Sequence, residues 1–173
     1  MRSTATIGSR SKGEGRSTLG ECRGTAGVAG KYERELGGGT KLPDMAGISH
    51  LDLTVRDLDR STAWYLDVLG LTELRRDEHP GRRVSVLYHP GSRLVIGLNE
   101  HDANPGEAFD ERRTGLDHVG FRVDSRDDLE AWGQHLDERD VTRSPIADTP
   151  VGSALVFRDP DQIQLEFWAK RSG

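Results

Sequence analysis

Hydrophobic residues occur at every second position in two stretches of the chain, and a histidine stands near the start of each stretch. The first, SHLDLTV, covers residues 49–55, and the second, DHVGFRV, covers residues 117–123. This alternation predicts β-strands with one buried face and one open face. The residues expected on the buried faces are Leu51, Leu53 and Val55 in the first stretch and Val119, Phe121 and Val123 in the second. The residues expected on the open faces are His50, Asp52 and Thr54, and His118, Gly120 and Arg122.

The two stretches belong to an internal repeat. His50 and His118 are 68 residues apart in the sequence. The same offset relates three further pairs of identical residues, which are Val55 and Val123, Ala63 and Ala131, and Trp64 and Trp132. An offset that is shared by a strand and by the segment after it indicates a duplicated supersecondary unit.

A helix is predicted after each of these strands. The first covers residues 58–69, with Asp57 as its N-cap and Gly70 as its end. The second follows Ser125, which forms the pattern of a capping box with Asp128. Its apolar residues at helical spacing are Leu129, Trp132 and Leu136.

Shorter strand-like runs complete each unit. They cover residues 72–76, 84–88 and 93–99 in the first unit, and 141–146, 154–158 and 162–168 in the second. Each unit therefore reads β-α-β-β-β. We predict an α+β fold in which two tandem modules form a curved, cup-shaped mixed sheet with the helices on the outside.

Module one is expected to cover about residues 47–100, the linker residues 101–115, and module two about residues 116–169. The linker region is rich in Gly, Pro and acidic residues and is long for a loop without secondary structure. Long loops of this kind are often functional, so we expect it to line a site.

Residues 1–44 differ from the rest of the chain in composition. They hold 10 of the 21 glycines and show almost no apolar periodicity, so they cannot bury enough surface to offset the entropy of ordering. We predict a disordered leader, followed by a domain over residues 45–173 whose functional chain begins at Met45. The leader lacks the apolar core of a signal peptide, and no segment has the length and apolarity of a membrane span.

Charge and cysteine usage narrow the classes of partner. Residues 45–173 carry 16 basic and 24 acidic side chains, a net charge of −8, which argues against nucleic acid or an anionic membrane as a partner. The single cysteine, Cys22, lies in the leader. The domain therefore has no cysteine that could act as a metal ligand or a nucleophile. The absence of cysteine from the domain predicts a protein of the reducing cytoplasm.

Three potential metal ligands are expected on the open faces. His50 and His118 stand at equivalent positions of the two modules, and the closing strand places Glu166 on the matching face. Two imidazoles and a carboxylate that point into one concavity form a metal site. A histidine at a strand start is also common as a hydrogen-bonding residue, and a Glu on an end strand is often solvated. The recurrence of the histidine at one register favours the metal site.

The opening HLDLTVRDLDRSTAWYLDVLGL and the closing VFRDPDQIQLEF, within paired β-α-β-β-β units, resemble the vicinal oxygen chelate superfamily. That superfamily contains glyoxalase I, extradiol dioxygenases, fosfomycin-modifying thiol transferases and bleomycin-resistance proteins. The resemblance covers about residues 47–169 and implies metal ligands from the first and last strands of both modules. His50, His118 and Glu166 fall on three of these positions.

The fourth ligand position that the resemblance implies falls on Gly97 by the alternation of the strand, or on Leu98 by the 68-residue offset, and neither has a ligating atom. This departs from glyoxalase I, which has Glu or Gln there. Glu100 or His101 would compensate if the strand bulges. His101 and His89 are also candidate catalytic bases. The alternative for both is a histidine in a loop or turn without such a role.

The resemblance implies an enzyme that acts on a small substrate with two adjacent oxygens, as a dioxygenase, lyase or isomerase. Two histidines and one carboxylate with open positions favour Fe²⁺, and Mn²⁺, Zn²⁺ or Ni²⁺ also fit. Such an ion stabilises an enolate or catecholate by Lewis acidity. The alternative is a metal-free protein, similar to the bleomycin-resistance proteins, that sequesters a small molecule. The resemblance also implies a homodimer.

Five residues are expected to contact the substrate from the open faces. They are Asp52, Thr54, Arg122, Gln164 and Trp168. Arg122 can hold a carboxylate or phosphate with two hydrogen bonds, or it can neutralise Asp52 in an ion pair. Trp168 either forms a wall of the pocket or packs at the end of its strand.

Overall fold

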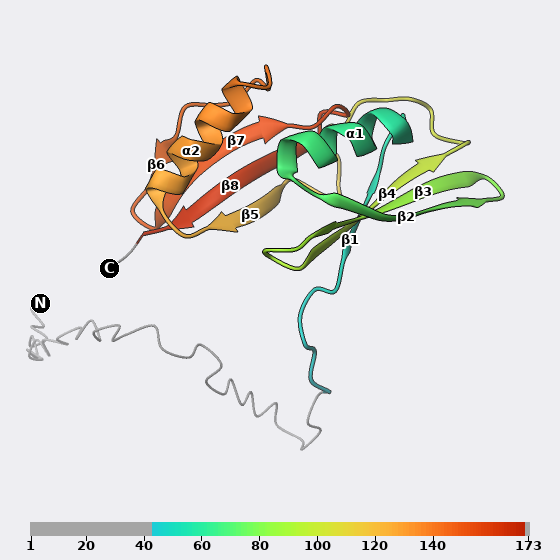
Figure 1. Cartoon of the computed structure of the whole chain (residues 1–173), viewed down its shortest axis with the longest axis horizontal. Helices are drawn as coiled ribbons and strands as arrows, with labels where there is room; N and C mark the ends of the chain where they lie inside the picture. The colour runs from blue at the N-terminus through green and yellow to red at the C-terminus, as the bar shows by residue number, and fades with distance from the viewer. Residues whose placement is uncertain (1–42, 172–173) are drawn as a thin grey trace, which may run out of the picture. The chain divides into compact units, whose positions relative to one another are not determined.

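The computed structural model describes residues 43–171, in which two modules of the same topology follow one another (Figure 1). Module one consists of β1 (Leu51–Thr54), α1 (Leu58–Leu69), β2 (Thr72–His79), β3 (Arg82–His89) and β4 (Leu94–His101). Its four strands form a sheet in the order β1-β4-β3-β2. β1 pairs with β4 in parallel, and the other neighbours are antiparallel.

Module two repeats this arrangement. It consists of β5 (Val119–Val123), α2 (Arg126–Asp137), β6 (Ala147–Asp148), β7 (Gly152–Arg158) and β8 (Gln164–Lys170). Its sheet has the order β5-β8-β7-β6, and β5 pairs with β8 in parallel. The predicted pair of β-α-β-β-β units is confirmed, and each unit forms a four-stranded mixed sheet of its own.

The helix limits follow from capping groups that the sequence already displays. α1 covers the predicted residues, with an Asp57 carboxylate oxygen that accepts from the backbone N–H of Arg60 at 3.0 Å. Gly70 ends it in the left-handed region, at φ 65°, where a residue without a Cβ is favoured. Ser125 and Asp128 form both hydrogen bonds of the capping box at the start of α2.

The predicted strand over residues 141–146 is wrong. That segment forms only an isolated bridge between Arg143 and Phe157, and the short strand β6 follows it. Two features explain the difference. Pro145 has no backbone N–H for a ladder, and the Arg143 guanidinium is bound by the Asp137 carboxylate and the Gly133 carbonyl oxygen of α2.

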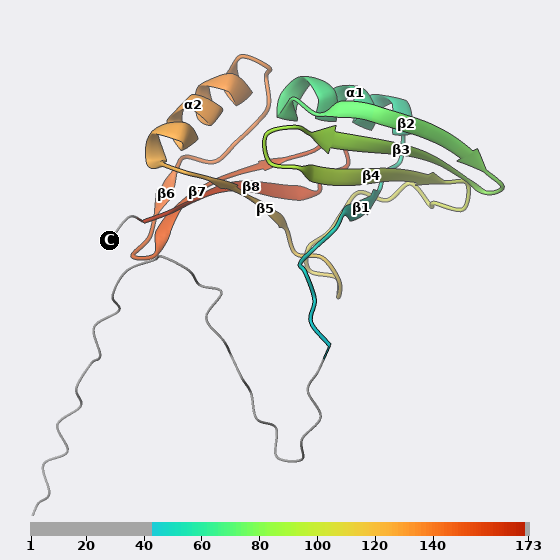
Figure 2. The same cartoon turned by 60° about the horizontal axis from the view of Figure 1, so that its bottom comes forward.

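Both helices lie on the same side of their sheets and leave the opposite sheet faces open (Figure 2). The alternating apolar residues of the strands fill the space beneath the helices, as the pattern predicted. Representative buried residues are Leu53, Val55, Ile96, Leu98, Leu165 and Phe167. Asp52, Thr54, Gly120 and Arg122 are exposed on the opposite faces.

The turn between β7 and β8 connects module two to α1 of module one through a buried aspartate. Asp159 has only 2% of its surface exposed, and its Oδ2 accepts from the Tyr65 hydroxyl at 3.1 Å. Its Oδ1 accepts from the backbone N–H groups of Asp161 and Ile163. Burial raises the pKa of Asp159 to about 6, and burial together with the Asp159 charge raises the pKa of Tyr65 well above its usual value.

A second aspartate of the same turn holds the start of α1. Asp161 accepts from the Ser61 hydroxyl at 3.0 Å and pairs with the Arg56 guanidinium at 2.5 Å. The two modules are therefore joined by charged and hydroxyl groups that are nearly all out of contact with water.

The predicted leader lies outside the described residues, apart from residues 43 and 44, which are exposed. Within the described part of the chain, neither of the 12-residue helices has the length needed to cross a membrane.

Replacement of Asp159 by Asn is expected to change how stability depends on pH. The folded-state pKa of about 6 lies above the ordinary value of 3.8, so folding favours the protonated carboxyl. The contribution of Asp159 to the free energy of unfolding is then full below pH 3.8 and is lost as the pH rises through about 6. Relative to Asp159→Asn, the wild type should lose roughly 2 kcal/mol between pH 4 and pH 7.

Urea unfolding of both proteins at several pH values in this range measures the difference. Asn retains the carbonyl oxygen that accepts from the backbone, so the variant should fold. If the free energy of unfolding depends on pH in the same way in both proteins, the raised pKa of Asp159 is contradicted.

Candidate metal centre

The two repeated histidines stand immediately before the first strand of each module. His50 precedes β1 and His118 precedes β5. The ring nitrogen Nδ1 of His50 lies 2.8 Å from the hydroxyl of Ser49, and that of His118 lies 2.6 Å from a carboxylate oxygen of Asp117. In both modules the preceding polar residue therefore occupies Nδ1 and leaves Nε2 for another partner. Histidines that bind metals are commonly oriented through their other nitrogen in this way.

The second ring nitrogen of His118, Nε2, faces Glu166. This nitrogen lies 3.6 Å from Oε1 of Glu166, which belongs to β8. Two ligands at bond lengths of about 2.1 Å from one ion lie roughly 3.0–3.4 Å apart, so this pair needs only a small movement to share an ion. His118 and Glu166 are called the module-two pair below.

The charge of this pair affects the imidazole. The pKa of His118 is raised above its ordinary value of 6.5, mainly because the ring donates to Asp117 and further because Glu166 lies close, while burial acts in the opposite direction.

The register of the parallel strands explains why the carboxylate reaches the imidazole. Glu166 of β8 lies opposite Gly120 of β5, two residues after His118. A Cβ at Gly120 would lie 3.2 Å from Oε1 of Glu166. The glycine thus provides the space in which the carboxylate lies over the neighbouring strand.

Module one contains a comparable pair with a different carboxylate. Nε2 of His50 lies 4.0 Å from Oδ2 of Asp52, and both side chains are about half exposed. His50 and Asp52 are called the module-one pair below. Both histidines line one groove of about 1260 Å³, whereas Glu166 and Asp52 are not among the residues that line it. Within residues 43–171, however, no three His, Cys, Asp or Glu side chains lie close enough together to hold an ion.

The other predicted contact residues lie in different surroundings. Arg122 lines the groove and pairs with Asp124 at 3.5 Å, so the predicted alternative of an ion pair with Asp52 is not found in this chain. Thr54 lies at the opposite end of β1 from His50. Gln164 accepts from the Arg158 guanidinium at 3.1 Å. Trp168 packs over Gly152, where a Cβ would lie 2.6 Å from the indole ring.

The bulge that would let Glu100 or His101 replace the missing ligand at position 97 does not occur. β3 and β4 pair in an uninterrupted register from one end to the other. Glu100 accepts from the backbone N–H of Leu58 at 2.7 Å at the start of α1, and it pairs with Arg83. His101 is the last residue of β4, five residues beyond the partner of Leu51, or roughly 16 Å along the strand.

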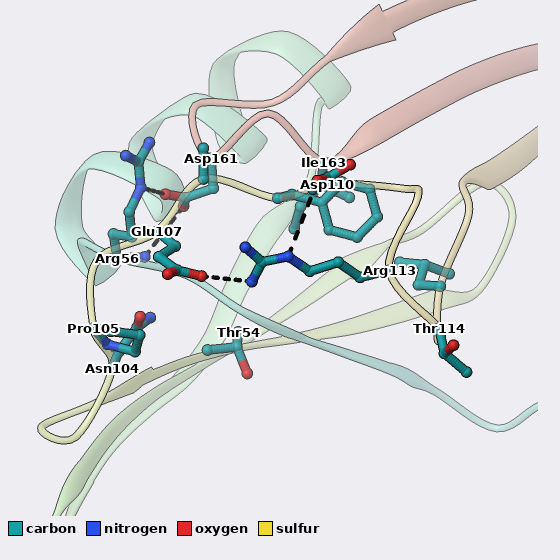
Figure 3. Close-up of a pocket in the computed structure, with 13 residues that line it drawn as sticks. Thr54, Arg56, Asn104, Pro105, Glu107, Asp110, Arg113, Thr114, Asp161 and Ile163 are labelled. Carbon is teal, nitrogen blue, oxygen red and sulfur yellow. Dashed lines mark hydrogen bonds and ion pairs between the residues drawn. The ribbon is translucent and has the colours of Figure 1, made fainter.

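The linker lines a smaller cavity of about 290 Å³ beside the end of β1, as Figure 3 shows. Arg113 lies between two linker carboxylates, at 2.5 Å from Glu107 and 4.0 Å from Asp110. Arg56 of the same cavity is paired with Asp161. The sequence predicted that the linker lines a site, and the charged groups that face this cavity are already paired with one another.

Sequence reasoning missed the residues that orient the two imidazoles. Ser49 and Asp117 are separated by the same 68 residues as the histidines, and both carry an oxygen that reaches Nδ1. In the sequence, the polar residue before each repeated histidine was the feature that could have indicated this orienting role.

Comparison with known proteins identifies the family. The profile described as Glyoxalase/Bleomycin resistance protein/Dioxygenase superfamily matches residues 47–167. A crystal structure of a glyoxylase/bleomycin resistance protein/dioxygenase domain from Frankia sp. EAN1pec is 40% identical in sequence, with a TM-score of 0.70. The match covers 74% of this chain and 100% of that one.

FosX from Listeria monocytogenes is a fosfomycin resistance protein that was crystallised with Mn(II) and sulfate. It is 21% identical, with a TM-score of 0.56, and the match covers 74% of this chain and 95% of that one. This likeness shows a shared fold.

Two curated relatives come from Bacillus subtilis. The putative ring-cleaving dioxygenase MhqA is 27% identical over 69% of this chain and 38% of its own length, and catechol-2,3-dioxygenase is 29% identical over 76% and 44%. The chain thus spans less than half the length of these two relatives. With the profile match over most of the chain and the likeness to the whole Frankia domain, the protein belongs to the glyoxalase/bleomycin resistance protein/dioxygenase superfamily.

Proposed function

We propose that this protein is a divalent-metal-dependent enzyme that acts on a small substrate with two adjacent oxygens, with His50, His118 and Glu166 as metal ligands. The observation that carries the proposal is the orientation of the two imidazoles. Each has its Nδ1 occupied by the preceding residue, and His118 directs Nε2 towards the Glu166 carboxylate at 3.6 Å. When such a ring is neutral and carries its proton on Nδ1, Nε2 presents a nitrogen donor to a metal ion, and at His118 this donor lies beside an oxygen donor.

The donor set favours Fe²⁺, while Mn²⁺, Zn²⁺ and Ni²⁺ are alternatives. Two histidines and one carboxylate leave positions for a substrate with two oxygens, and the bound ion would supply Lewis acidity to those oxygens. Protonation of His118 competes with binding, so the affinity for the ion should fall as the pH drops below the raised pKa of this residue.

The groove that both histidines line offers one further group for a small-molecule substrate. Arg122 contributes a cation there, which suits an anionic substituent or adjacent oxygens of the substrate. Similarity to two dioxygenases supports ring cleavage as the leading reaction, with a lyase or isomerase reaction as the alternative.

We further propose that the complete centre forms in a homodimer. In one chain the module-one pair and the module-two pair do not converge into a set of three among residues 43–171. β1 and β5 are edge strands of their sheets, so each has one side without a paired strand among residues 43–171, and we propose that a second chain meets this side. A dimer would bring His50 of one chain to the module-two pair of the other.

Removal of single ligands should weaken metal binding strongly. His50→Ala, His118→Ala and Glu166→Gln are each expected to reduce the affinity for Mn²⁺ or anaerobic Fe²⁺ by at least about tenfold, because each removes one donor atom. Calorimetric titration measures this change. His79→Ala is the matched control, since His79 is exposed in β2 and does not line the groove. A wild-type protein that binds none of the four ions would overturn the proposal.

A heterodimer of two inactive chains tests where the centre forms. Chains with His50→Ala and with Glu166→Gln, carrying different affinity tags, are co-expressed and the mixed dimer is purified. If the centre joins two chains, one of its two sites keeps all three ligands, and the mixed dimer should bind about half the Mn²⁺ of the wild type. If each chain holds its own centre, the mixed dimer should bind no more than the two variant homodimers.

Turnover distinguishes an enzyme from a protein that sequesters its ligand. The Fe²⁺-loaded protein should convert one member of a panel of catechols, methylglyoxal–thiol adducts and fosfomycin, and His118→Ala should abolish this turnover. Absorbance and mass spectrometry detect the products. Ligand binding that persists in both His50→Ala and His118→Ala, without any turnover, would instead support sequestration.

A further inference from the structure

We propose that Asp52 supplies a second carboxylate ligand to the centre, so that the four donors are two histidine–carboxylate pairs, one from each module. The inference depends on the metal centre proposed above. It concerns the position at which the sequence has Gly97 in place of a ligand.

The strand register places Gly97 at the point that corresponds to Glu166. In module two, Glu166 of the last strand lies opposite Gly120 of the first strand, two residues after His118. In module one, Gly97 of the last strand lies opposite Asp52 of the first strand, two residues after His50. The carboxylate and the glycine have thus exchanged strands between the two modules.

The Asp52 side chain fills the space that Gly97 leaves. A Cβ built at Gly97 would lie 1.9 Å from Oδ1 of Asp52 and 2.9 Å from its Cγ, so no other residue fits there without moving this carboxylate. Gly97 does not have a positive φ, and its backbone therefore does not require a glycine. The Asp52 carboxylate, at the end of a half-exposed side chain, lies where a side chain at position 97 would begin.

The carboxylate also faces the nitrogen that is available for a metal. Oδ2 of Asp52 lies 4.0 Å from Nε2 of His50, while Nδ1 of the same ring is occupied by Ser49. A carboxylate that served to orient the ring would bind Nδ1 and support the ligand from behind. Asp52 lies on the opposite side of the ring, where Glu166 lies relative to His118.

Glu100 and His101 do not compete for this role, because Glu100 is bound to the start of α1 and His101 lies at the far end of β4. Asp52 is therefore the carboxylate that module one presents beside its histidine. Two carboxylates and two neutral imidazoles would balance the charge of a divalent ion, and the fourth donor would leave one open position fewer than a three-ligand centre has.

The test is a transfer of the carboxylate from one strand to the other. Asp52→Asn should weaken Mn²⁺ binding by at least about tenfold in a calorimetric titration. The double variant Asp52→Gly with Gly97→Glu places the carboxylate on β4 above a glycine of β1, which is the arrangement of module two, and it should recover most of the wild-type affinity. Asp77→Asn, which removes one carboxylate from β2, should leave the affinity unchanged.

Absorption of the Co²⁺-loaded proteins separates a ligand from a nearby charge. The visible Co²⁺ bands should change in Asp52→Asn and return in the double variant, because they depend on the donor atoms around the ion. Bands that are unchanged in Asp52→Asn would overturn the proposal, as would a double variant that binds no better than Asp52→Gly alone. Circular dichroism confirms that each variant is folded.

Failure of the two proposals is distinguishable. If the wild type binds no ion, the metal centre itself is wrong. If the wild type binds and His50→Ala does not, while Asp52→Asn binds as the wild type does, the centre stands and the role of Asp52 is wrong.

Discussion

The parallel pairing of the first and last strands in each module is the constraint on which the proposed centre depends. Parallel neighbours bring residues that are far apart in the sequence to fixed positions on one face, and the register decides which residues those are. In module two this pairing brings His118 and Glu166 to 3.6 Å, although they are 48 residues apart. A shift of one residue would turn the carboxylate into the core.

The arrangement of the modules within one chain depends on a different set of contacts. Asp159 and Asp161 in the turn between β7 and β8 bind hydroxyl and guanidinium groups at the start of α1 and within it. Buried polar groups of this kind stabilise a fold only when their hydrogen bonds are satisfied, and here each carboxylate has several partners. The link joins the turn between β7 and β8 to α1 and to Arg56, the residue that precedes its N-cap.

The separation of the two histidine–carboxylate pairs connects the fold to the proposed chemistry. A centre assembled from two modules would surround one ion with donors from both modules and leave positions on the ion for a small substrate. Because the module is duplicated, the residues of one module can change while the other module keeps its histidine and carboxylate. In this chain module two keeps its carboxylate on the last strand, whereas module one has a glycine there and an aspartate on the first strand.

The sequence by itself determined much of the fold. Alternating apolar residues predicted the packing faces of β1, β5 and β8, and capping residues such as Asp57 and Ser125 predicted where the helices begin. These features are local, since side-chain alternation and caps depend on residues a few positions apart. The strand predicted over residues 141–146 failed because the Arg143 contacts with α2 override the local pattern.

Only the tertiary structure decided which groups meet. The sequence placed His50, His118 and Glu166 on open faces, but the register of two distant strands was needed to show that Glu166 lies beside His118. The same register showed that Asp52 occupies the space over Gly97. Such contacts depend on hydrogen bonding and packing between segments that are remote in the chain, and hydrophobic periodicity contains no information about that pairing.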